Sequence, residues 1–549
     1  MNRLHLHHSS LRRITGWIAS CALGVCYQGQ AASPAQSSSD RTDGPKSTAA
    51  DLGVPFSVEP QTTLGKVLID GRRFDYRAVA DALTVHTKAW DDAAPSKPDT
   101  PLQPEASIFY VAYFLAGDGD RAQRPVTFLF NGGPGSSTIW LHMGAFGPRR
   151  VVTSDDTHTP AAPNMLVNNE FSLLDASDLV FIDAPGTGFS RLRGTDAEKA
   201  FYGVDQDAQA FASFITQFLT KYDRWNSPKY LFGESYGTTR AAALANVLAT
   251  EQSIDLNGIM LMSQILNFDG RNDDERFNPG VDLPYELVLP TYAAIAWYHH
   301  KLPDSSAKLP ALLEEVEHFA MTDYAVALLA GSRATEQERH DIALRLHGYT
   351  SLPAEYIEQS DLRVAGAQFQ QRLLNASAET VGRLDARYKG PTRDPLNKDA
   401  EYDPARSAAQ SAYVGTFNDY VRRELKYRPG FEYKVVGDLD PVWDFRHRPP
   451  GAPVVLPRTT NVMPDLASAM IYNPRLRIQV HLGYYDLATP FYEGVYEMEH
   501  LAIPPGLRGN IEFCLYEAGH KVYAHEPSLK ALHEKATEFI LRTAVARSP

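Results

Sequence analysis

The chain has 549 residues, of which 44% are hydrophobic and 22% charged, as is ordinary for a soluble globular protein. That length suits one large domain with an insertion, or two domains. The formal net charge is −13, and no long basic cluster interleaved with aromatic residues offsets it, which argues against a nucleic-acid-binding surface.

Residues 1–31 have the layout of a secretory signal peptide. Two arginines precede an apolar stretch at 14–27, and small residues follow around Ala31. The stretch is too short for a membrane span, so we expect cleavage and export to the periplasm or the medium. Two alternatives stay open. The paired arginines suit twin-arginine export of the folded protein, and Cys21 suits a lipoprotein cleavage site that would leave a lipid anchor.

The remaining cysteines and the segment after the signal fit an exported chain. The three cysteines are Cys21, Cys26 and Cys514. Removal of the signal leaves Cys514 alone, so no intrachain disulfide is possible. Residues 32–55 are rich in Ser, Pro, Ala and Asp, which predicts a disordered leader.

Short apolar runs ended by turn residues predict a series of strands. The first two runs, 66–69 and 73–76, flank an Asp70-Gly71 turn and predict a hairpin. The others lie at 106–115, 126–130, 179–182, 230–232, 259–262, 477–482 and 511–516.

Helical apolar stripes at 204–222 and 529–543 accompany these strands. Alternation of strand and helix predicts a mostly parallel α/β sheet with helices on both faces. Strand signals nearly vanish at 285–440, where helical patterns dominate, so we expect a helical cap insertion there. The sheet domain would then comprise 56–284 and 441–549, and a second, unrelated helical domain is the alternative.

The segment Gly233 to Gly237 (GESYG) lies between a predicted strand and a predicted helix. This is the setting in which a G-x-S-x-G pattern indicates a nucleophile on a sharp turn. The turn pushes the Ser235 hydroxyl outward, and the flanking glycines allow neighbouring backbone to come close. We therefore take Ser235 as a candidate nucleophile. The alternative is an ordinary serine in a glycine-bounded turn.

A base and an acid follow in the chain order of the α/β-hydrolases, which is Ser, then Asp or Glu, then His. Asp486 comes directly after the strand 477–482, and His520 after the strand 511–516. Other candidates for the acid are Asp183, Asp440 and Asp465.

Backbone donors for an oxyanion can come from the glycine-rich loop after the strand 126–130. We assign the N–H groups of Gly133 and Tyr236 to that role, worth roughly 3–4 kcal/mol each in the transition state. The chain has no dinucleotide fingerprint, phosphate-binding loop or zinc signature, so no cofactor and no metal are implied.

Four motifs together resemble the serine carboxypeptidases of the cathepsin A and carboxypeptidase Y type. They are NGGPGSS at 131–137, DAPGTGFS at 183–190, GESYG at 233–237 and AGH at 518–520. The resemblance runs from about residue 105 to the C-terminus. It implies an α/β-hydrolase fold with a helical insertion, and release of single residues from peptide C-termini at acidic pH.

The resemblance also implies roles for individual residues. The triad would be Ser235, Asp486 and His520. The oxyanion donors would be Gly133 and Tyr236. The residues that bind the substrate's terminal carboxylate would be Asn131, Gly132 and Glu234. Glu234 must be protonated to donate a hydrogen bond to a carboxylate, so peptide affinity is expected to rise as pH falls.

Some positions depart from the family pattern. Leu129 and Ala145 stand where the family has Trp and Glu, and Ser136 stands where a cysteine is usual. Arg149 or Arg150 is an alternative partner for a carboxylate. Peptides are the expected substrates, no membrane span is expected in the mature protein, and both monomer and homodimer stay open. The rival functions are an esterase or acyltransferase on this fold and a non-catalytic binding protein.

Overall fold

The computed structural model describes residues 56, 58–88, 102–117, 122–271, 273, 278–303, 308–439, 442–455 and 459–544. The predicted signal peptide 1–31 and leader 32–55 lie outside these residues. Within them, every helix is too short or too polar to cross a membrane.

The predicted N-terminal hairpin is confirmed and is longer than the sequence pattern indicated. Strand β1 (Gln61–Ile69) pairs antiparallel with β2 (Arg72–His86). The turn residues Asp70 and Gly71 have φ values of 47° and 73°. Positive φ at both positions matches the right-handed twist of the flanking strands, which is why Asp-Gly is a strong hairpin signal.

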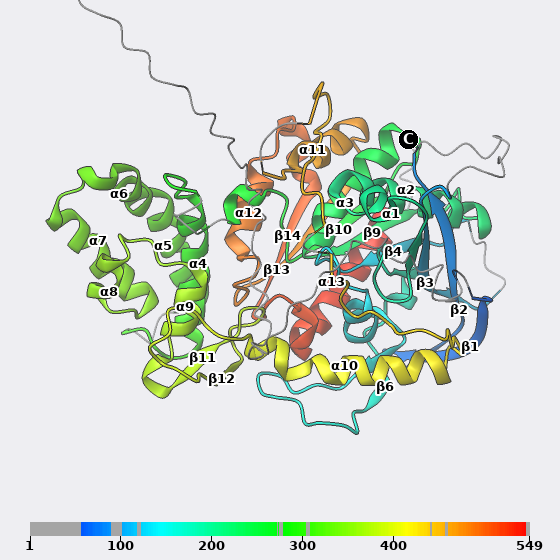
Figure 1. Ribbon diagram of the computed structural model, residues 1–549, viewed down its shortest axis with the longest axis horizontal. Coiled ribbons are helices and arrows are strands. Elements are labelled where there is room, and N and C mark those ends of the chain that lie inside the picture. Colours follow the sequence, from blue (N-terminus) through cyan, green and yellow to red (C-terminus); the bar gives the residue numbers. More distant parts are fainter. Residues whose placement is uncertain are drawn as a thin grey trace, which may run out of the picture. The chain divides into compact units, whose positions relative to one another are not determined.

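The hairpin forms one edge of a mostly parallel sheet, in the order β1-β2-β3-β7-β4-β9-β10-β13-β14 (Figure 1). Neighbouring strands from β1 to β7 are antiparallel, and those from β7 to β14 are parallel. The predicted sheet type is therefore confirmed. The bounds are β3 (Glu105–Leu115), β4 (Val126–Phe130), β7 (Asp178–Ile182), β9 (Lys229–Glu234), β10 (Gly258–Met262), β13 (Arg477–Gly483) and β14 (Ile511–Tyr516).

Helices cover both faces of this sheet, and each face has its own apolar core. Along β9 the side chain of Leu231 enters one core and those of Tyr230 and Phe232 the other, because successive residues of a strand point to opposite faces. The first face carries α2 (Val204–Lys221), α3 (Tyr236–Thr250) and α11 (Met463–Tyr472); the second carries the π-helical turn η2 (Leu141–Phe146), α10 (Pro404–Arg423) and α13 (Glu526–Ala544).

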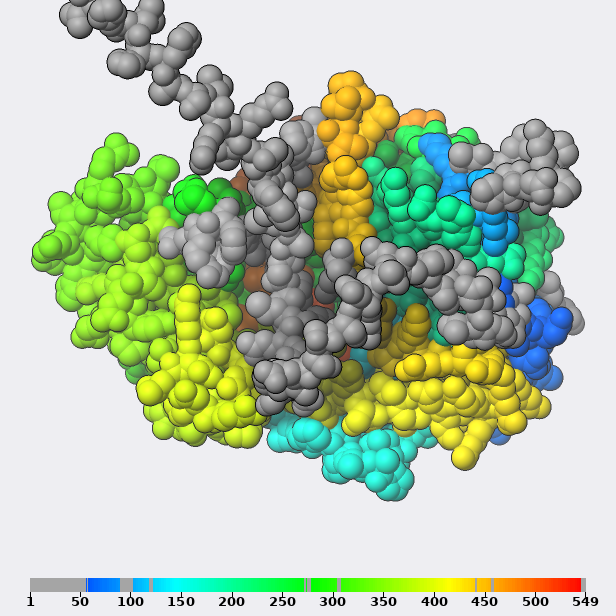
Figure 2. Space-filling model, in the orientation of Figure 1, coloured from blue at the N-terminus to red at the C-terminus, as the bar shows by residue number. Residues whose placement is uncertain are grey.

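The chain between β10 and β13 is largely helical. Figure 1 shows α4 to α9 gathered in green on one side of the sheet, with α4 packed against α12. Helix α10 instead packs on η2 and β5 and forms a yellow ridge in Figure 2. The bounds are α4 (Leu283–Tyr298), α5 (Leu309–Phe319), α6 (Ala325–Ala330), α7 (Glu336–Thr350), α8 (Ala354–Gln359), α9 (Gly366–Arg372), α12 (Phe491–Glu499) and β5 (Arg149–Val151).

A short hairpin of β11 (Glu379–Val381) and β12 (Lys389–Pro391) interrupts the helices. The helical pattern did not predict it, because three-residue strands leave no readable alternation. The division into core and cap stays a prediction.

A buried ion pair ties α2 and α3 to the loop after β4. The Arg240 guanidinium lies 2.6 Å from the Asp207 carboxylate, and both side chains are inaccessible to solvent. Arg240 also donates to the backbone carbonyl of Asn131 at 2.6 Å. One cation thus joins two helices and the glycine-rich loop.

A histidine between two carboxylates fastens the segment 442–455 to the sheet domain. His447 lies 2.6 Å from Asp205 in α2 and 2.7 Å from Asp465 in α11. These carboxylates outweigh burial and raise the pKa of His447 to about 9. In the same segment the Trp443 ring lies 5.5 Å from the ring of Tyr236. The histidine therefore also helps to hold a neighbour of the GESYG turn.

We expect Arg240→Met to lower the free energy of unfolding by about 3–5 kcal/mol, because it leaves the Asp207 carboxylate buried without a counter-charge. Urea unfolding followed by circular dichroism measures this. The control is Arg423→Met, whose exposed ion pair with Asp419 should change stability by under about 1 kcal/mol. Equal effects of the two substitutions would contradict the buried-pair argument.

His447 should stabilise the fold in a pH-dependent way. Its pKa is about 9 in the folded state and about 6.5 in the unfolded chain. The contribution is therefore fully present below about pH 6.5 and is lost as pH rises through about 9. We expect His447→Gln to cost about 2–3 kcal/mol at pH 6 and little at pH 10, as measured by denaturant unfolding at each pH. A pH-independent difference would exclude this titration.

Candidate functional site

Ser235 lies on a strained turn between β9 and α3. Its φ and ψ are 61° and −130°, outside the common regions for a residue with a side chain, and it stays partly accessible to solvent. A Cβ on Gly233 would lie 2.2 Å from the Gly237 carbonyl, and one on Gly237 would lie 2.8 Å from the Phe130 carbonyl. Both flanking glycines are therefore sterically required, and the turn presents the serine side chain above the sheet.

Asp486 and His520 are in direct contact at the carboxyl ends of β13 and β14. The His520 Nδ1 atom lies 2.7 Å from Oδ2 of Asp486. Because the carboxylate accepts, Nδ1 carries the proton and the Nε2 lone pair is left to act as a base. Asp486 is fully buried and also accepts hydrogen bonds from Ala488 N (2.7 Å), Thr489 N (3.0 Å) and Thr489 Oγ1 (2.6 Å).

Thr489 is a site residue that the sequence reasoning missed. Besides donating to Asp486, its hydroxyl lies 3.0 Å from His520 Nδ1. Thr489 thus helps to fix both partners. The available signal was the aspartate itself, because Asp side chains often accept hydrogen bonds from backbone N–H groups two or three residues later in a turn, which brings Thr489 beside Asp486.

The strand between the two halves of the site links Ser235 to this pair. Ser235 N donates to the Met262 carbonyl at the end of β10 (2.9 Å), and Ser263 Oγ donates to the His520 carbonyl (2.6 Å). In the described part of the chain, the Ser235 hydroxyl makes no hydrogen bond to His520. Such bonds are often long before substrate binds, and the three candidates lie at the same edge of neighbouring parallel strands.

The candidate oxyanion donors belong to two segments in close contact. A Cβ on Gly132 would lie 2.4 Å from Tyr236 N, so the loop after β4 runs directly against the start of α3. Gly133 is exposed and has a φ of 113°, a conformation that favours glycine. Tyr236 is the first residue of α3, where backbone N–H groups lack partners within the helix. This contact is what an oxyanion site built from these N–H groups requires.

The predicted carboxylate-binding residues have mixed surroundings. Glu234 is buried, accepts a hydrogen bond from Tyr523 Oη (2.9 Å), and has its pKa raised by burial. The Asn131 side chain accepts from Leu141 N (3.1 Å). Ala145 is fully buried in the apolar core of η2 and offers no polar group in place of the family's Glu.

Leu129 is also a fully buried core residue on β4. Ser136 accepts a hydrogen bond from the Trp140 indole N–H (2.9 Å). The two candidate arginines have carboxylate partners within the chain: Arg149 lies 3.3 Å from Glu424, and Arg150 lies 3.5 Å from Glu526.

The rival acids are engaged elsewhere. Asp465 binds His447. Asp183 accepts from Thr138 N (2.8 Å) and from Tyr433 Oη (3.0 Å). Asp440 lies outside the described residues.

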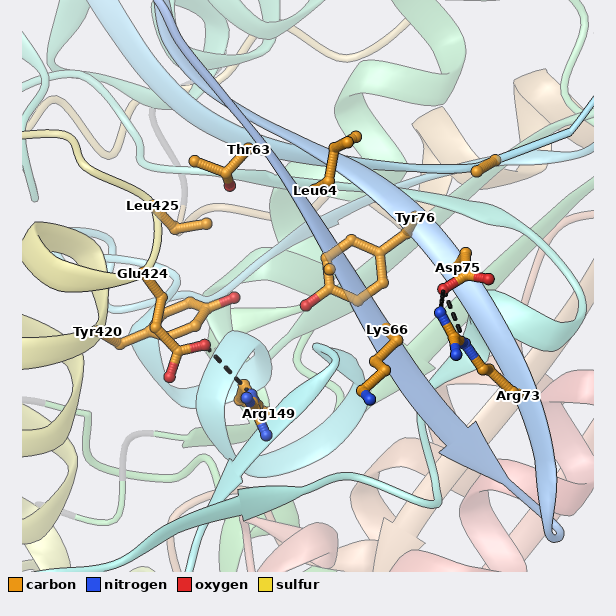
Figure 3. Close-up of a pocket in the computed structure, with 12 residues that line it drawn as sticks. Thr63, Leu64, Lys66, Arg73, Asp75, Tyr76, Arg149, Tyr420, Glu424 and Leu425 are labelled. Carbon is orange, nitrogen blue, oxygen red and sulfur yellow. Dashed lines mark hydrogen bonds and ion pairs between the residues drawn. The ribbon is translucent and has the colours of Figure 1, made fainter.

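A hollow of about 540 Å³ opens beside the edge strand β1, between β1, β2 and α10 (Figure 3). The ion pair of Arg149 and Glu424 (3.3 Å) lines it, together with Tyr76. In the strand order, β1 lies five strands from β9. The hollow is therefore separate from the Ser235 turn.

Sequence comparisons with known proteins bear on about one third of the chain. Residues 100–276 match the family model for serine carboxypeptidase. Serine carboxypeptidase-like 35 of Arabidopsis thaliana is 28% identical over 177 residues, covering 30% of this chain and 35% of that protein. The pheromone-processing carboxypeptidase KEX1 of Yarrowia lipolytica is 32% identical over 142 residues, covering 25% and 21%.

Among solved structures, a prohormone-processing carboxypeptidase from Saccharomyces cerevisiae matches with a TM-score of 0.50 and 15% identity. The match covers 84% of this chain and 91% of that one. It confirms the predicted α/β-hydrolase fold.

The matched segment contains three of the four motifs, at 131–137, 183–190 and 233–237, so the resemblance is confirmed there. Asp486 and His520 lie beyond the match. The chain covers about a third or less of the length of these curated relatives. The activity of the whole protein, its substrates and its partners are therefore proposals.

We expect Asp486→Asn to lower kcat for a p-nitrophenyl ester by about 10⁴-fold, because an amide in this position no longer holds the productive histidine tautomer. Steady-state hydrolysis measures the change, and near-ultraviolet circular dichroism verifies folding. The exposed Asp341→Asn is the matched control. A loss of less than about tenfold would remove Asp486 from the proposed triad.

Proposed function

We propose that this chain, whose residues 100–276 match the serine carboxypeptidases, is an exported serine hydrolase that releases C-terminal residues from peptides. The observation that carries the proposal is the combination of a strained, partly exposed Ser235 with a hydrogen-bonded Asp486–His520 pair at the same edge of the sheet. No cofactor enters the proposed reaction.

In the proposed reaction, Ser235 Oγ attacks the scissile carbonyl carbon while His520 Nε2 takes the hydroxyl proton. The tetrahedral intermediate collapses as the imidazolium gives that proton to the leaving amine, which departs as a free amino acid. Water then attacks the acyl-enzyme, with His520 again acting first as base and then as acid. The products are the shortened peptide and regenerated enzyme.

The surrounding groups act on charge and orientation. The Asp486 carboxylate keeps the proton on Nδ1 and stabilises the imidazolium, and its four hydrogen bonds fix it in place. The N–H groups of Gly133 and Tyr236 would stabilise the oxyanion, which exists only in the transition state and intermediate. Asn131, Gly132 and Glu234 stay proposed contacts for the substrate's carboxylate.

An esterase or acyltransferase is the second candidate. The apolar Leu129 and Ala145 favour it, because half of the family's carboxylate-binding network is then absent. An acyltransferase would keep the same acyl-enzyme and transfer the acyl group to an alcohol instead of water. A non-catalytic binding protein is the third candidate, and failure of a fluorophosphonate probe to label Ser235 would favour it.

We expect a mixed peptide library to be shortened by one C-terminal residue at a time, more rapidly at about pH 4.5 than at a pH well above neutrality. Mass spectrometry of the products measures this, with Ser235→Ala as the inactive control. Intact peptides beside rapid hydrolysis of simple esters would instead favour the esterase or acyltransferase.

A further inference from the structure

A lysine directly follows the candidate base and places its ammonium over the face of an aromatic ring. Lys521 Nζ lies 3.4 Å from the centroid of the Trp140 ring and 5.5 Å from that of Tyr413. The residue is partly accessible to solvent, although most of its side chain is enclosed. A cation over the face of an indole is attracted to it, but an aromatic face does not replace an anion.

The Lys521 ammonium has no direct anionic partner. In the described part of the chain it makes no ion pair and no hydrogen bond, and Glu234, Asp403 and Arg406 act on it only through longer-range electrostatics. Removal from water makes an unpaired cation costly, and it lowers the pKa of Lys521 to about 8. The ammonium is still charged at neutral pH, so the site has an unmet positive charge.

The groups around Lys521 belong to the candidate site itself. The Trp140 indole N–H donates to Ser136 Oγ (2.9 Å), and Ser136 N donates to the Gly132 carbonyl (2.9 Å) within the oxyanion loop. Two residues beyond Lys521, the Tyr523 hydroxyl holds the Glu234 carboxylate. The Lys521 ammonium therefore lies over a ring that is hydrogen-bonded to the loop after β4, and Lys521 is two residues from the tyrosine that holds Glu234.

We propose that the Lys521 ammonium binds the free C-terminal carboxylate of the peptide. It would take the place of the Glu that the family has at the position of Ala145. The inference rests on the proposed function and names the group that would select its substrates. In a peptide losing one residue, the terminal carboxylate belongs to the residue directly after the scissile carbonyl, and consecutive Cα atoms are only about 3.8 Å apart. Its counter-charge must therefore lie close to the base, and Lys521 is bonded to His520.

Charge pairing differs from recognition by Glu234 in its dependence on pH. A glutamic acid binds a carboxylate only while it is protonated, whereas an ammonium binds it until the ammonium itself loses its proton. With Lys521 as the partner, peptide affinity should persist through neutrality and fall above about pH 8. The other charged or titratable groups near the lysine are Tyr413, Glu234, Asp403, Arg406 and the adjacent His520.

The test compares three substrates that carry the same acyl group. They are an N-acyl dipeptide with a neutral C-terminal residue, the C-terminal amide of that dipeptide, and the methyl ester of the N-acyl amino acid, in which the scissile bond is the ester. We expect Lys521→Met to raise KM for the free-acid dipeptide by about 30-fold or more, with kcat little changed. Hydrolysis of the amide and the ester should stay within about threefold of wild type. Lys521→Arg should recover most of the loss, and the exposed Lys535→Met should change nothing.

Three results would overturn the proposal. One is an unchanged KM for the free acid in Lys521→Met while the wild-type enzyme cleaves it. Another is an equal loss on the free acid and the ester, since the lysine would then serve the shared acylation machinery. If Lys521→Met does not fold, the wild-type pH profile decides. A KM for the free acid that has finished rising by pH 7, or stays flat from pH 7 to 10, excludes the ammonium.

Failure of the underlying function would look different. A wild-type enzyme that hydrolyses the ester but neither peptide is no carboxypeptidase, and the role of Lys521 falls with that function. A wild-type enzyme that cleaves the amide as efficiently as the free acid is a peptidase without carboxylate recognition, and this result also excludes the lysine's role. If the wild-type enzyme shortens peptides one residue at a time and Lys521→Met has an unchanged KM, only the role of the lysine is excluded.

Discussion

The close approach of three backbone segments around Ser235 is the constraint on which the rest of the site depends. The loop after β4, the turn after β9 and the start of α3 come so near one another that any side chain at Gly132, Gly233 or Gly237 would meet backbone atoms. The same closeness brings Gly132 against Tyr236, the first residue of α3. The buried Arg240 then holds this assembly from below, through the Asn131 carbonyl and Asp207. One steric arrangement thus positions the candidate nucleophile and the loop proposed to supply oxyanion donors.

The charged groups around this turn differ in how fully they are paired. Asp486 is fully satisfied by four hydrogen bonds, so its charge is committed to His520. Glu234 is held by Tyr523 beneath the serine. Among the residues that the structure describes, the Lys521 ammonium lies over the Trp140 ring and makes no ion pair. The structure therefore separates the groups that orient the base from a charge that is still available for a ligand, and peptide specificity is most readily sought there.

Much of the fold and of the candidate site could be predicted from the sequence, because the informative signals are local. The buried strands appear as short apolar runs, and the Asp70-Gly71 dipeptide reports a turn with positive φ at both residues. Asp486 and His520 were found because each follows directly after a strand, at the end of the sheet where such residues meet. The hairpin of β11 and β12 and the role of Thr489 were missed, since three-residue strands and a single hydroxyl leave no periodic signal.

The class of fold, the glycine-bounded turn at Ser235 and the residue types that can serve as base and acid could be predicted from the sequence, because they follow from periodicity, glycine positions and chain order. Tertiary structure alone decided which charges meet. Arg149 and Arg150 have their own carboxylate partners. The lysine beside His520 lies over Trp140, 381 positions earlier in the chain, and has no carboxylate partner among the described residues. Such pairings depend on distances between segments far apart in sequence, and no local pattern records them.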